Sequence, residues 1–309
     1  MDKEALIIRF SSLGDVVLSS CVIEPLISKG YRPHLLTFEP YGVVFEDDVR
    51  LKVIQVKKGK LFSKETLRNI QGFDLYLDLQ KNFKTSMLRL LLKGKWKTYN
   101  KHSFRRRLSV YIESFRKPFS VVEAYLQSLG EKEGKPRIHV SQERLKKWKE
   151  EMGDNYISIG AGARYRKKTY PYFGDVCELL SKHGQKVVFV GDDADSKLVD
   201  SWKGINLCGK LSLVDTLAVI KTSKLFIGND SGLLHMARAV GTKAIQIYGG
   251  THPTLGFSLH SDEGKVLFKG LKCQPCSIHG KGVCKYATYE CLDINPQEVV
   301  TTVVDLLRT

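Results

Sequence analysis

The sequence contains no uninterrupted apolar run approaching the roughly 18–20 residues of a membrane-spanning helix. The apolar stretch near the N-terminus is too short for the core of a signal peptide, and Arg9 interrupts it. Short-period repeats and low-complexity tracts are also absent, and a composition of 42% hydrophobic and 27% charged residues excludes a disordered, collagen-like or coiled-coil protein. We therefore expect a cytosolic globular protein whose 309 residues form about two domains.

Negative charge is scarce, and it is missing altogether from one long stretch. The chain has 49 Lys and Arg residues against 33 Asp and Glu residues, a net charge of +16, which favours anionic partners such as nucleic acid, a membrane surface or phosphorylated small molecules. No acidic residue lies between Asp78 and Glu113. A solvated face is the ordinary explanation for any single charge, but a block of one sign costs self-repulsion, so we interpret this block as a docking surface for an anionic partner. Its basic residues are Lys81, Lys84, Arg89, Lys93, Lys95, Lys97, Lys101, Arg105, Arg106 and Arg107.

Short apolar segments alternate with amphipathic ones along the whole chain. Expected strands span residues 5–10, 34–38, 52–56, 74–79, 155–160, 186–191, 224–229 and 243–249. Expected helices span residues 16–30, 142–154, 172–184, 213–223 and 296–309. This alternation predicts parallel sheets covered on both faces, in two α/β domains with a boundary near residue 150. Ligands of such folds bind at the carboxyl ends of the strands.

The first loop that could carry functional side chains is Ser11–Asp15, which follows the first expected strand and precedes a helix. Gly14 permits close backbone approach, and the first N–H groups of the helix can bind an anion. Asp15 is either the cap of this helix or a general base in reach of a substrate hydroxyl. The sequence pattern by itself leaves both interpretations open.

Two further loops are suited to anions. In the loop 228–235, Asp230 or Ser231 can cap the following helix, and Ser231 and His235 share a helix face, which suits a phosphate or a ribose hydroxyl. In the loop 160–171, small residues come directly before four cations within five residues, as a diphosphate site requires. Neither loop has the spacing of a Walker A or a dinucleotide-binding motif. The alternative for the loop 228–235 is that it simply caps the helix that follows it.

A fourth loop, 191–195, contains three aspartates after a strand. It superficially resembles a metal-binding DxD motif, but we expect Asp192 and Asp193 to form a capping turn. Asp195 is expected to reach a ribose. No metal ion is expected at this site.

The seven cysteines form two groups. Cys21, Cys177 and Cys208 lie on apolar segments and are expected to be packed thiols. The odd total and the missing signal sequence argue against a secreted disulfide scaffold. The second group has the spacing C-x2-C-x7-C-x6-C, which leaves zinc, a disulfide or a local structural cluster open. It consists of Cys273, Cys276, Cys284 and Cys291.

Taken together, these segments resemble the heptosyltransferases of lipopolysaccharide inner-core synthesis, glycosyltransferase family 9. The loop SSLGD follows the first strand, residues 168–171 match the family pattern K-x-[WY]-P, and residues 229–253 follow D-[ST]-G-L-x-H-x-A-x-A-x-G with a later Y-G-x-T-x-P. The segment Cys273-x-Pro275-Cys276 also recurs in many members. The chain departs from common family members at Arg164, Tyr170 and Ser231.

The resemblance implies a GT-B fold, with two Rossmann-like domains whose parallel sheets face each other across a cleft. Residues 1–150 would bind the acceptor and residues 151–309 the nucleotide-sugar, with the last helix, 296–309, packing back toward the first domain. The implied reaction transfers heptose from ADP-heptose with inversion and without a metal ion or other cofactor. The implied acceptor is an anionic lipopolysaccharide precursor at the cytoplasmic face of the inner membrane, where the enzyme would be peripheral.

The resemblance also implies roles for individual residues. Asp15 matches the proposed general base, and Lys168 matches the lysine at the donor diphosphate. The remaining donor-binding residues would be Ala163, Arg164, Asp195, Asp230, Ser231, Gly232, Leu233 and His235. Acceptor-binding residues would be Ser12, Gly14, Lys101, Arg105, Arg106 and Arg107.

Two other functions remain as alternatives. One is a GT-B transferase that uses another nucleotide-sugar or another acceptor. The other is a basic nucleic-acid-binding protein, motivated by the charge of +16 but supported by no recognition-helix, RNP or zinc-finger pattern. We expect no nucleic-acid partner.

Overall fold

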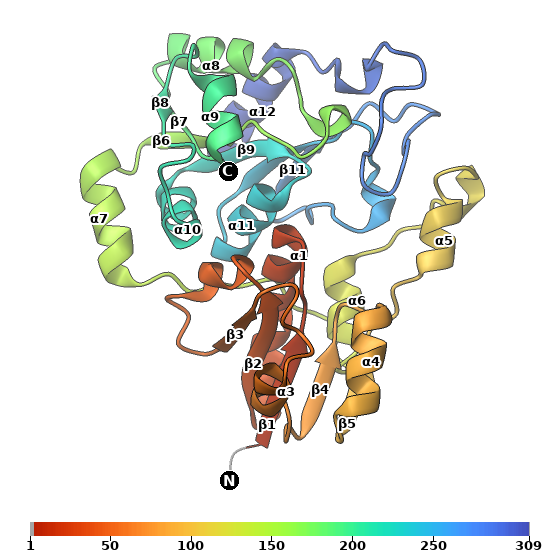
Figure 1. The fold of residues 1–309 in the computed structure, drawn as a ribbon. Coiled ribbons are helices and arrows are strands. Elements are labelled where there is room, and N and C mark those ends of the chain that lie inside the picture. Colours follow the sequence, from red (N-terminus) through yellow and green to blue (C-terminus); the bar gives the residue numbers. More distant parts are fainter. Residues whose placement is uncertain (1–2, 309) are drawn as a thin grey trace. The chain divides into compact units, whose positions relative to one another are not determined.

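The computed structural model describes residues 3–308, which form two compact units. The first unit comprises the chain up to Lys101 together with Val121–Ser141, and the second comprises His102–Ser120 together with the chain from Gln142 onward. Each unit has one parallel sheet (Figure 1). Each also has its own buried core. The predicted α/β fold with two Rossmann-like sheets is confirmed, and the roles expected of the two domains stay predictions.

The five-stranded sheet of the first unit has the order β3-β2-β1-β4-β5, and all neighbouring strands are parallel. Its central strands are apolar runs covered on both faces, as parallel sheets require. Because β1 lies between β2 and β4, the sheet reverses its winding there, and the loops after β1 and β4 lie at the switch point. The strands are Lys3–Ile8 (β1), Tyr31–Phe38 (β2), Lys52–Val56 (β3), Leu75–Asp78 (β4) and Lys95–Thr98 (β5).

The first unit's helices are shorter than the sequence pattern predicts. The single helix expected over residues 16–30 is wrong, because a 3-10 turn at Ser19–Val22 separates α1 from α2. The hydroxyls of Ser19 and Ser20 donate hydrogen bonds to the carbonyls of Val16 and Val17, which favours this tighter turn. The helices are Leu13–Leu18 (α1), Ile23–Ser28 (α2), Lys64–Asn69 (α3), Phe83–Leu91 (α4) and Val121–Gln127 (α6), with a further 3-10 turn at Tyr41–Phe45.

The six-stranded sheet of the second unit has the order β11-β10-β9-β6-β7-β8, again with all neighbours parallel. Its switch point lies between β6 and β9, where Gly160 pairs with Gly228 in register. The loops 160–171 and 228–235 therefore leave adjacent strands at the same edge of the sheet. The strands are Tyr156–Gly160 (β6), Lys186–Phe189 (β7), Ile205–Asn206 (β8), Leu225–Asn229 (β9), Ala244–Ile247 (β10) and Gly264–Leu267 (β11).

Helices of the second unit pack their apolar residues into its core. The last helix, α12, contacts α8 and the strands β10 and β11, with Val299, Val300 and Val303 buried there. The α-helices are Ser103–Leu108 (α5), Gln142–Met152 (α7), Phe173–Lys182 (α8), Asp193–Val199 (α9), Leu213–Thr222 (α10), Gly232–Val240 (α11) and Pro296–Arg308 (α12). The 3-10 turns are Glu113–Phe115 (η3), Arg166–Lys168 (η4), Pro253–Leu255 (η5) and Glu290–Leu292 (η6). None of the helices in residues 3–308 has the length and apolar character that crossing a bilayer requires.

Candidate active site

A buried ion pair joins two of the predicted donor-binding residues in the second unit. The Lys168 ammonium, at the end of η4, lies 2.8 Å from Oδ2 of Asp230, directly after β9. The Asp230 side chain is 6% exposed and that of Lys168 is 17% exposed. Thr251 Oγ1 donates to the same carboxylate at 3.0 Å, and Gln246 Nε2 lies 3.4 Å from its other oxygen. Burial raises the pKa of Asp230, but the Lys168 charge outweighs this and keeps the pKa below its ordinary value.

Ser231 lies at the N-terminus of the nine-residue helix α11, immediately after Asp230. Its extended backbone (φ −141°, ψ 177°) places it at the N-cap position, as the sequence pattern predicts, but its side chain makes no capping hydrogen bond. Ser231 Oγ is buried, and nothing within residues 3–308 hydrogen-bonds to it. Gly232 and Leu233 form the first turn of α11, whose backbone N–H groups carry the positive end of the helix dipole. A hydroxyl donor and a helix N-terminus therefore adjoin the Lys168–Asp230 pair.

His235 lies one turn further along α11 and is buried. Its ring centroid is 5.8 Å from that of Phe257. A protonated His235 would lie close enough to Asp230 to help lower the pKa of that carboxyl.

Asn229 connects the loops 160–171 and 228–235 at this edge of the sheet, a role that no motif in the sequence indicated. Its Oδ1 accepts a hydrogen bond from the Tyr170 backbone N–H at 2.9 Å. Its Nδ2 donates to the carbonyls of Ala161 and Gly162, at 2.7 and 3.2 Å. The sequence does contain a signal for this role, because Asn229 ends the apolar segment 224–229. A polar side chain that is buried with such a segment needs hydrogen-bond partners.

Asp195 lies against the glycine-rich loop. A Cβ atom at Gly162 would come within 1.7 Å of Asp195 Oδ1, and one at Gly191 within 2.4 Å of Oδ2, so both positions have room only for glycine. Burial and the neighbouring Asp192 carboxylate raise the pKa of Asp195. The predicted capping turn is confirmed for Asp192, whose side chain accepts hydrogen bonds from the first turn of α9.

The other two residues predicted at this loop are more open to solvent. Ala163 is half-buried, and Arg164 is exposed with its guanidinium 5.5 Å from the Tyr165 ring centroid. The aromatic residue of the K-x-[WY]-P pattern, Tyr170, is buried, and its hydroxyl donates to the Ile294 carbonyl at 2.7 Å. Tyr170 therefore has a packing role.

In the first unit, the predicted base Asp15 pairs with Arg9. The Arg9 guanidinium lies 2.7 Å from Asp15 Oδ1, with 7% of the Arg9 side chain and 17% of the Asp15 side chain exposed. Ser12 Oγ donates to Asp15 Oδ2 at 2.9 Å, and the Ser12 backbone N–H lies 3.3 Å from the same oxygen. Ser12, not Asp15, therefore occupies the cap position of α1, and the buried Gly14 follows in its first turn.

Arg9 is held in place on several sides. Its Nη1 donates to the Leu79 carbonyl after β4, so the guanidinium spans the switch point of the sheet. Burial lowers the pKa of Arg9, but Asp15 and the hydroxyls of Tyr125 and Tyr99 outweigh this and raise it. From the sequence alone Arg9 stands out only as a charge within an apolar stretch, because its partner Asp15 is six residues away on the next element.

The basic block divides between the two units. Lys101 is the last residue of the first segment of the first unit, whereas Arg105, Arg106 and Arg107 lie on α5 in the second unit. Arg106 is buried, with its guanidinium 5.2 Å from the Phe119 ring centroid and 5.5 Å from that of Phe257. Arg105 also lies over Phe119, and Arg107 is exposed. The three arginines therefore have different surroundings, and their joint role in acceptor binding stays a prediction.

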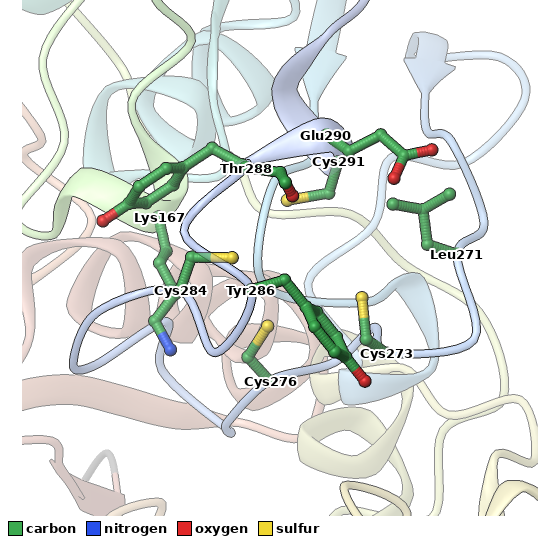
Figure 2. Close-up of a pocket in the computed structure, with 10 residues that line it drawn as sticks. Lys167, Leu271, Cys273, Cys276, Cys284, Tyr286, Thr288, Glu290 and Cys291 are labelled. Carbon is green, nitrogen blue, oxygen red and sulfur yellow. The ribbon is translucent and has the colours of Figure 1, made fainter.

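Four cysteines and Lys167 line one cavity of about 130 Å³ (Figure 2). All seven cysteines are thiols, and Cys21, Cys177 and Cys208 are buried as predicted. Burial raises the pKa of Cys291 to about 11. Burial also raises the pKa of the Cys284 thiol, but backbone N–H groups, those of Tyr289 and Tyr286 foremost, outweigh it and lower that pKa. Within residues 3–308, no three His, Cys, Asp or Glu side chains are grouped as metal ligands would be.

The segment 273–291, called the cysteine segment below, supports the turn that carries Lys168. The backbone N–H of Cys276 donates to the Gly250 carbonyl at 2.9 Å, and the Gly250 N–H donates to the Lys167 carbonyl at 2.6 Å. A Cβ atom at Gly280 would lie 2.6 Å from Lys168 Cγ. The position of Lys168 therefore depends on this segment as well as on Asp230.

The sequence model of glycosyltransferase family 9 (heptosyltransferase) matches residues 63–286. The chain belongs to glycosyltransferase family 9. It is a glycosyltransferase, as predicted. A curated relative, lipooligosaccharide heptosyltransferase 2 of Campylobacter jejuni strain 81116, is 24% identical over 273 residues, which cover 82% of each chain.

Solved structures share the fold of this family 9 chain. A family 9 glycosyltransferase from Veillonella parvula aligns over 99% of this chain and 97% of its own, with a TM-score of 0.77 and 21% identity. The E. coli ADP-heptose lipopolysaccharide heptosyltransferase II aligns over 98% of both chains, with a TM-score of 0.75 and 18% identity. At these identities the likeness establishes the fold alone, which confirms the predicted GT-B class.

Proposed function

We propose that this glycosyltransferase moves heptose from ADP-heptose to the Kdo/heptose inner core of lipopolysaccharide, with inversion and without a metal ion. The names of the E. coli and Campylobacter proteins support the donor and the acceptor class. One observation from the chain itself carries the proposal, namely which partner of each buried ion pair is presented to solvent. Arg9 is more buried than its partner Asp15, whereas Asp230 is more buried than its partner Lys168.

The pair in the second unit suits a departing diphosphate. Lys168 presents a cation whose position Asp230 fixes, and the N–H groups at the start of α11 and the unpaired Ser231 hydroxyl adjoin it. Negative charge on the diphosphate grows as the glycosidic bond to the donor breaks, and fixed positive groups stabilise that charge without reorganising. These groups do the work that a divalent cation does in other transferases.

The pair in the first unit suits proton removal. The acceptor hydroxyl oxygen bonds to the anomeric carbon, its proton passes to the Asp15 carboxylate, and ADP leaves with the electron pair of the broken bond. Attack on the face opposite ADP inverts the anomeric configuration. The Arg9 guanidinium lies 2.7 Å from Asp15 Oδ1 and fixes the position of that oxygen.

The proposed acceptor explains why the protein carries a large positive net charge. A phosphorylated, Kdo-bearing lipid is anionic, and a net charge of +16 attracts it to a chain at the cytoplasmic face of the inner membrane. Lys101, Arg105, Arg106 and Arg107 are the proposed acceptor residues, together with Ser12 and Gly14. Donor-binding roles are proposed for Ala163, Arg164, Asp195, Gly232, Leu233 and His235, in addition to Lys168, Asp230 and Ser231.

Product masses test this function. The purified chain is incubated with ADP-heptose and a panel of truncated core lipids, with and without EDTA. We expect one acceptor to gain the mass of a single heptose and EDTA to leave the yield unchanged. A strict Mg²⁺ requirement would contradict the metal-free mechanism. Thermal stabilisation by UDP or GDP in preference to ADP would indicate another donor, and salt-sensitive RNA binding without a response to ADP would favour a nucleic-acid-binding protein.

A further inference from the structure

Helix α4 of the first unit has a face of large apolar side chains that the structure leaves in solvent. Phe83 is 78% exposed and Leu90 is 88% exposed, with Met87 and Leu91 beside them. Their spacing, i, i+4, i+7 and i+8, places all four on one side of the helix. An apolar group of this size on the surface of a globular protein marks an interaction site.

The opposite side of α4 already anchors the helix to its unit. Thr85 and Leu88 are buried, and Leu88 belongs to the core of the first unit together with Leu92, just after the helix. The hydroxyl and amide groups of Asn82 and Thr85 cap the N-terminus reciprocally. The exposed apolar face is therefore a second face of a fixed helix, and folding does not require it.

Cations lie close to this face in the sequence. The stretch 81–97 has six Lys and Arg residues and no acidic residue, and most of these cations are exposed. The strand β5, which follows α4, alternates Lys95 and Lys97 with Trp96, whose ring stacks on Tyr76 with centroids 4.7 Å apart. An apolar helix face with Lys and Arg beside it has the chemistry of a helix lying in a membrane interface, where the apolar groups enter the acyl boundary and the cations contact anionic headgroups.

We propose that α4 is a membrane-docking helix, which inserts Phe83, Met87, Leu90 and Leu91 into the surface of a bilayer that contains anionic lipid. This inference deepens the peripheral membrane association within the proposed function, and its test requires no transferase activity. Charge complementarity selects the lipid surface over a second copy of the chain. A symmetric pairing of two α4 faces would bring the same cations of both copies together.

Vesicle binding of the full chain tests the proposal. We compare phosphatidylcholine vesicles with vesicles that also contain phosphatidylglycerol, using the wild type and the double variant Leu90→Ser/Leu91→Ser. The wild type is expected to bind the anionic vesicles. The variant is expected to bind them at least about tenfold more weakly, because it lacks the two leucine side chains that would move from water into the bilayer. Val49→Ser is the matched control, since Val49 is a 95% exposed apolar residue of the same unit outside α4. It is expected to bind like the wild type.

A depth measurement separates insertion from purely electrostatic attachment. In the variant Phe83→Trp, the fluorescence of the added indole is expected to shift to shorter wavelength on vesicle binding and to be quenched by brominated acyl chains, relative to the wild-type protein under the same conditions. Equal binding by the wild type and the Leu90→Ser/Leu91→Ser variant overturns the proposal, as does the absence of anionic vesicle binding. Self-association of the wild type that the double variant abolishes would identify a second copy as the occupant instead.

The proposed transferase function and the docking helix can fail separately. A Leu90→Ser/Leu91→Ser variant that turns over a detergent-dispersed acceptor normally but loses activity on vesicle-bound acceptor supports both. Vesicle binding through α4 without any heptose transfer refutes the proposed heptose transfer and leaves the docking helix standing.

Discussion

At the scale of single residues, the two buried ion pairs resemble each other in distance and differ in which partner is presented. Arg9 and Asp15 lie 2.7 Å apart, and Lys168 and Asp230 lie 2.8 Å apart. Each less exposed partner also has fixed hydrogen bonds, from Arg9 to the Leu79 carbonyl and from Thr251 to Asp230. Burying an ion pair is a weak means of stabilisation, because desolvation consumes most of the attraction. A role in orienting the presented charge explains why the fold retains both pairs.

Removing the presented carboxylate should slow catalysis strongly and spare the donor complex. In Asp15→Asn, we expect kcat to fall by about 10²–10⁴-fold, the usual contribution of a positioned base. ADP affinity, measured by calorimetry, should stay within about twofold, a change of roughly 0.4 kcal/mol. Because the variant leaves the buried Arg9 charge without its carboxylate, its Tm must be measured too, and kinetics must be compared well below it. Turnover near the wild-type rate would remove Asp15 as the base.

The contribution of the Lys168–Asp230 pair to folding stability should depend on pH. The folded-state pKa of Asp230 lies below its ordinary value of 3.8, so the pair stabilises the fold fully above that value, and the contribution disappears as pH falls through the folded-state pKa. We expect Asp230→Asn to lower Tm at neutral pH, and the difference from the wild type to shrink as pH falls below about 4 and to vanish only below the folded-state pKa. Differential scanning calorimetry across this range checks it. A Tm difference that does not change with pH would show that ionisation of Asp230 contributes no stability.

At the scale of secondary-structure elements, strands with continuous apolar runs could be predicted and elements held by distant contacts could not. The strand over 52–56 and the helix start at Pro296 have the predicted limits. The strand β5 was missed, because Lys95 and Lys97 interrupt its pattern and its pairing with β4 is a non-local contact. The site divides similarly. Motifs located Asp230, Ser231 and, in the pattern Y-G-x-T-x-P, Thr251. Arg9 and Asn229 act through partners that no local pattern identifies.

The cysteine segment allows a test of how an element positions Lys168. Gly280 and Gly282 both have left-handed backbone, with φ of 74° and 83°, but only a Cβ at Gly280 would meet the Lys168 side chain. Each change to Ala should cost about 1–2 kcal/mol of stability through backbone strain. Only Gly280→Ala should also weaken ADP binding, by about tenfold, equivalent to roughly 1.4 kcal/mol.

Calorimetric titration of both variants with ADP measures this difference, and thermal unfolding measures the shared strain. Equal ADP affinities in Gly280→Ala and Gly282→Ala would show that the segment packs beside Lys168 without positioning it. Weaker binding in both would point to a general disturbance of the loop instead.

At the scale of the whole molecule, a net charge of +16 produces a positive electrostatic field. Its effect on a ligand depends on where each cation lies. Arg106 is enclosed by Phe119 and Phe257, so a substitution there would disturb packing as well as charge. Arg105 and Arg107 are more open to solvent on the same helix, α5, and are the positions at which the acceptor field can be tested. Lys146 and Lys149 on α7 are exposed cations of the same unit outside the basic block.

Reversing charge at α5 should weaken the acceptor complex and leave the donor complex intact. In Arg105→Glu/Arg107→Glu, we expect the acceptor KM to rise by about tenfold or more at low salt, because a charge near an anionic lipid surface contributes about 1 kcal/mol. The matched variant Lys146→Glu/Lys149→Glu changes net charge equally and should change KM far less, since these exposed lysines lie outside the basic block proposed to bind the acceptor. Between about 0.1 M and 1 M salt the Debye length falls from about 10 Å to 3 Å, so the gap between the two variants should largely close. Equal acceptor KM values for the two variants at low salt would mean that net charge alone, and not the placement of the arginines on α5, attracts the acceptor.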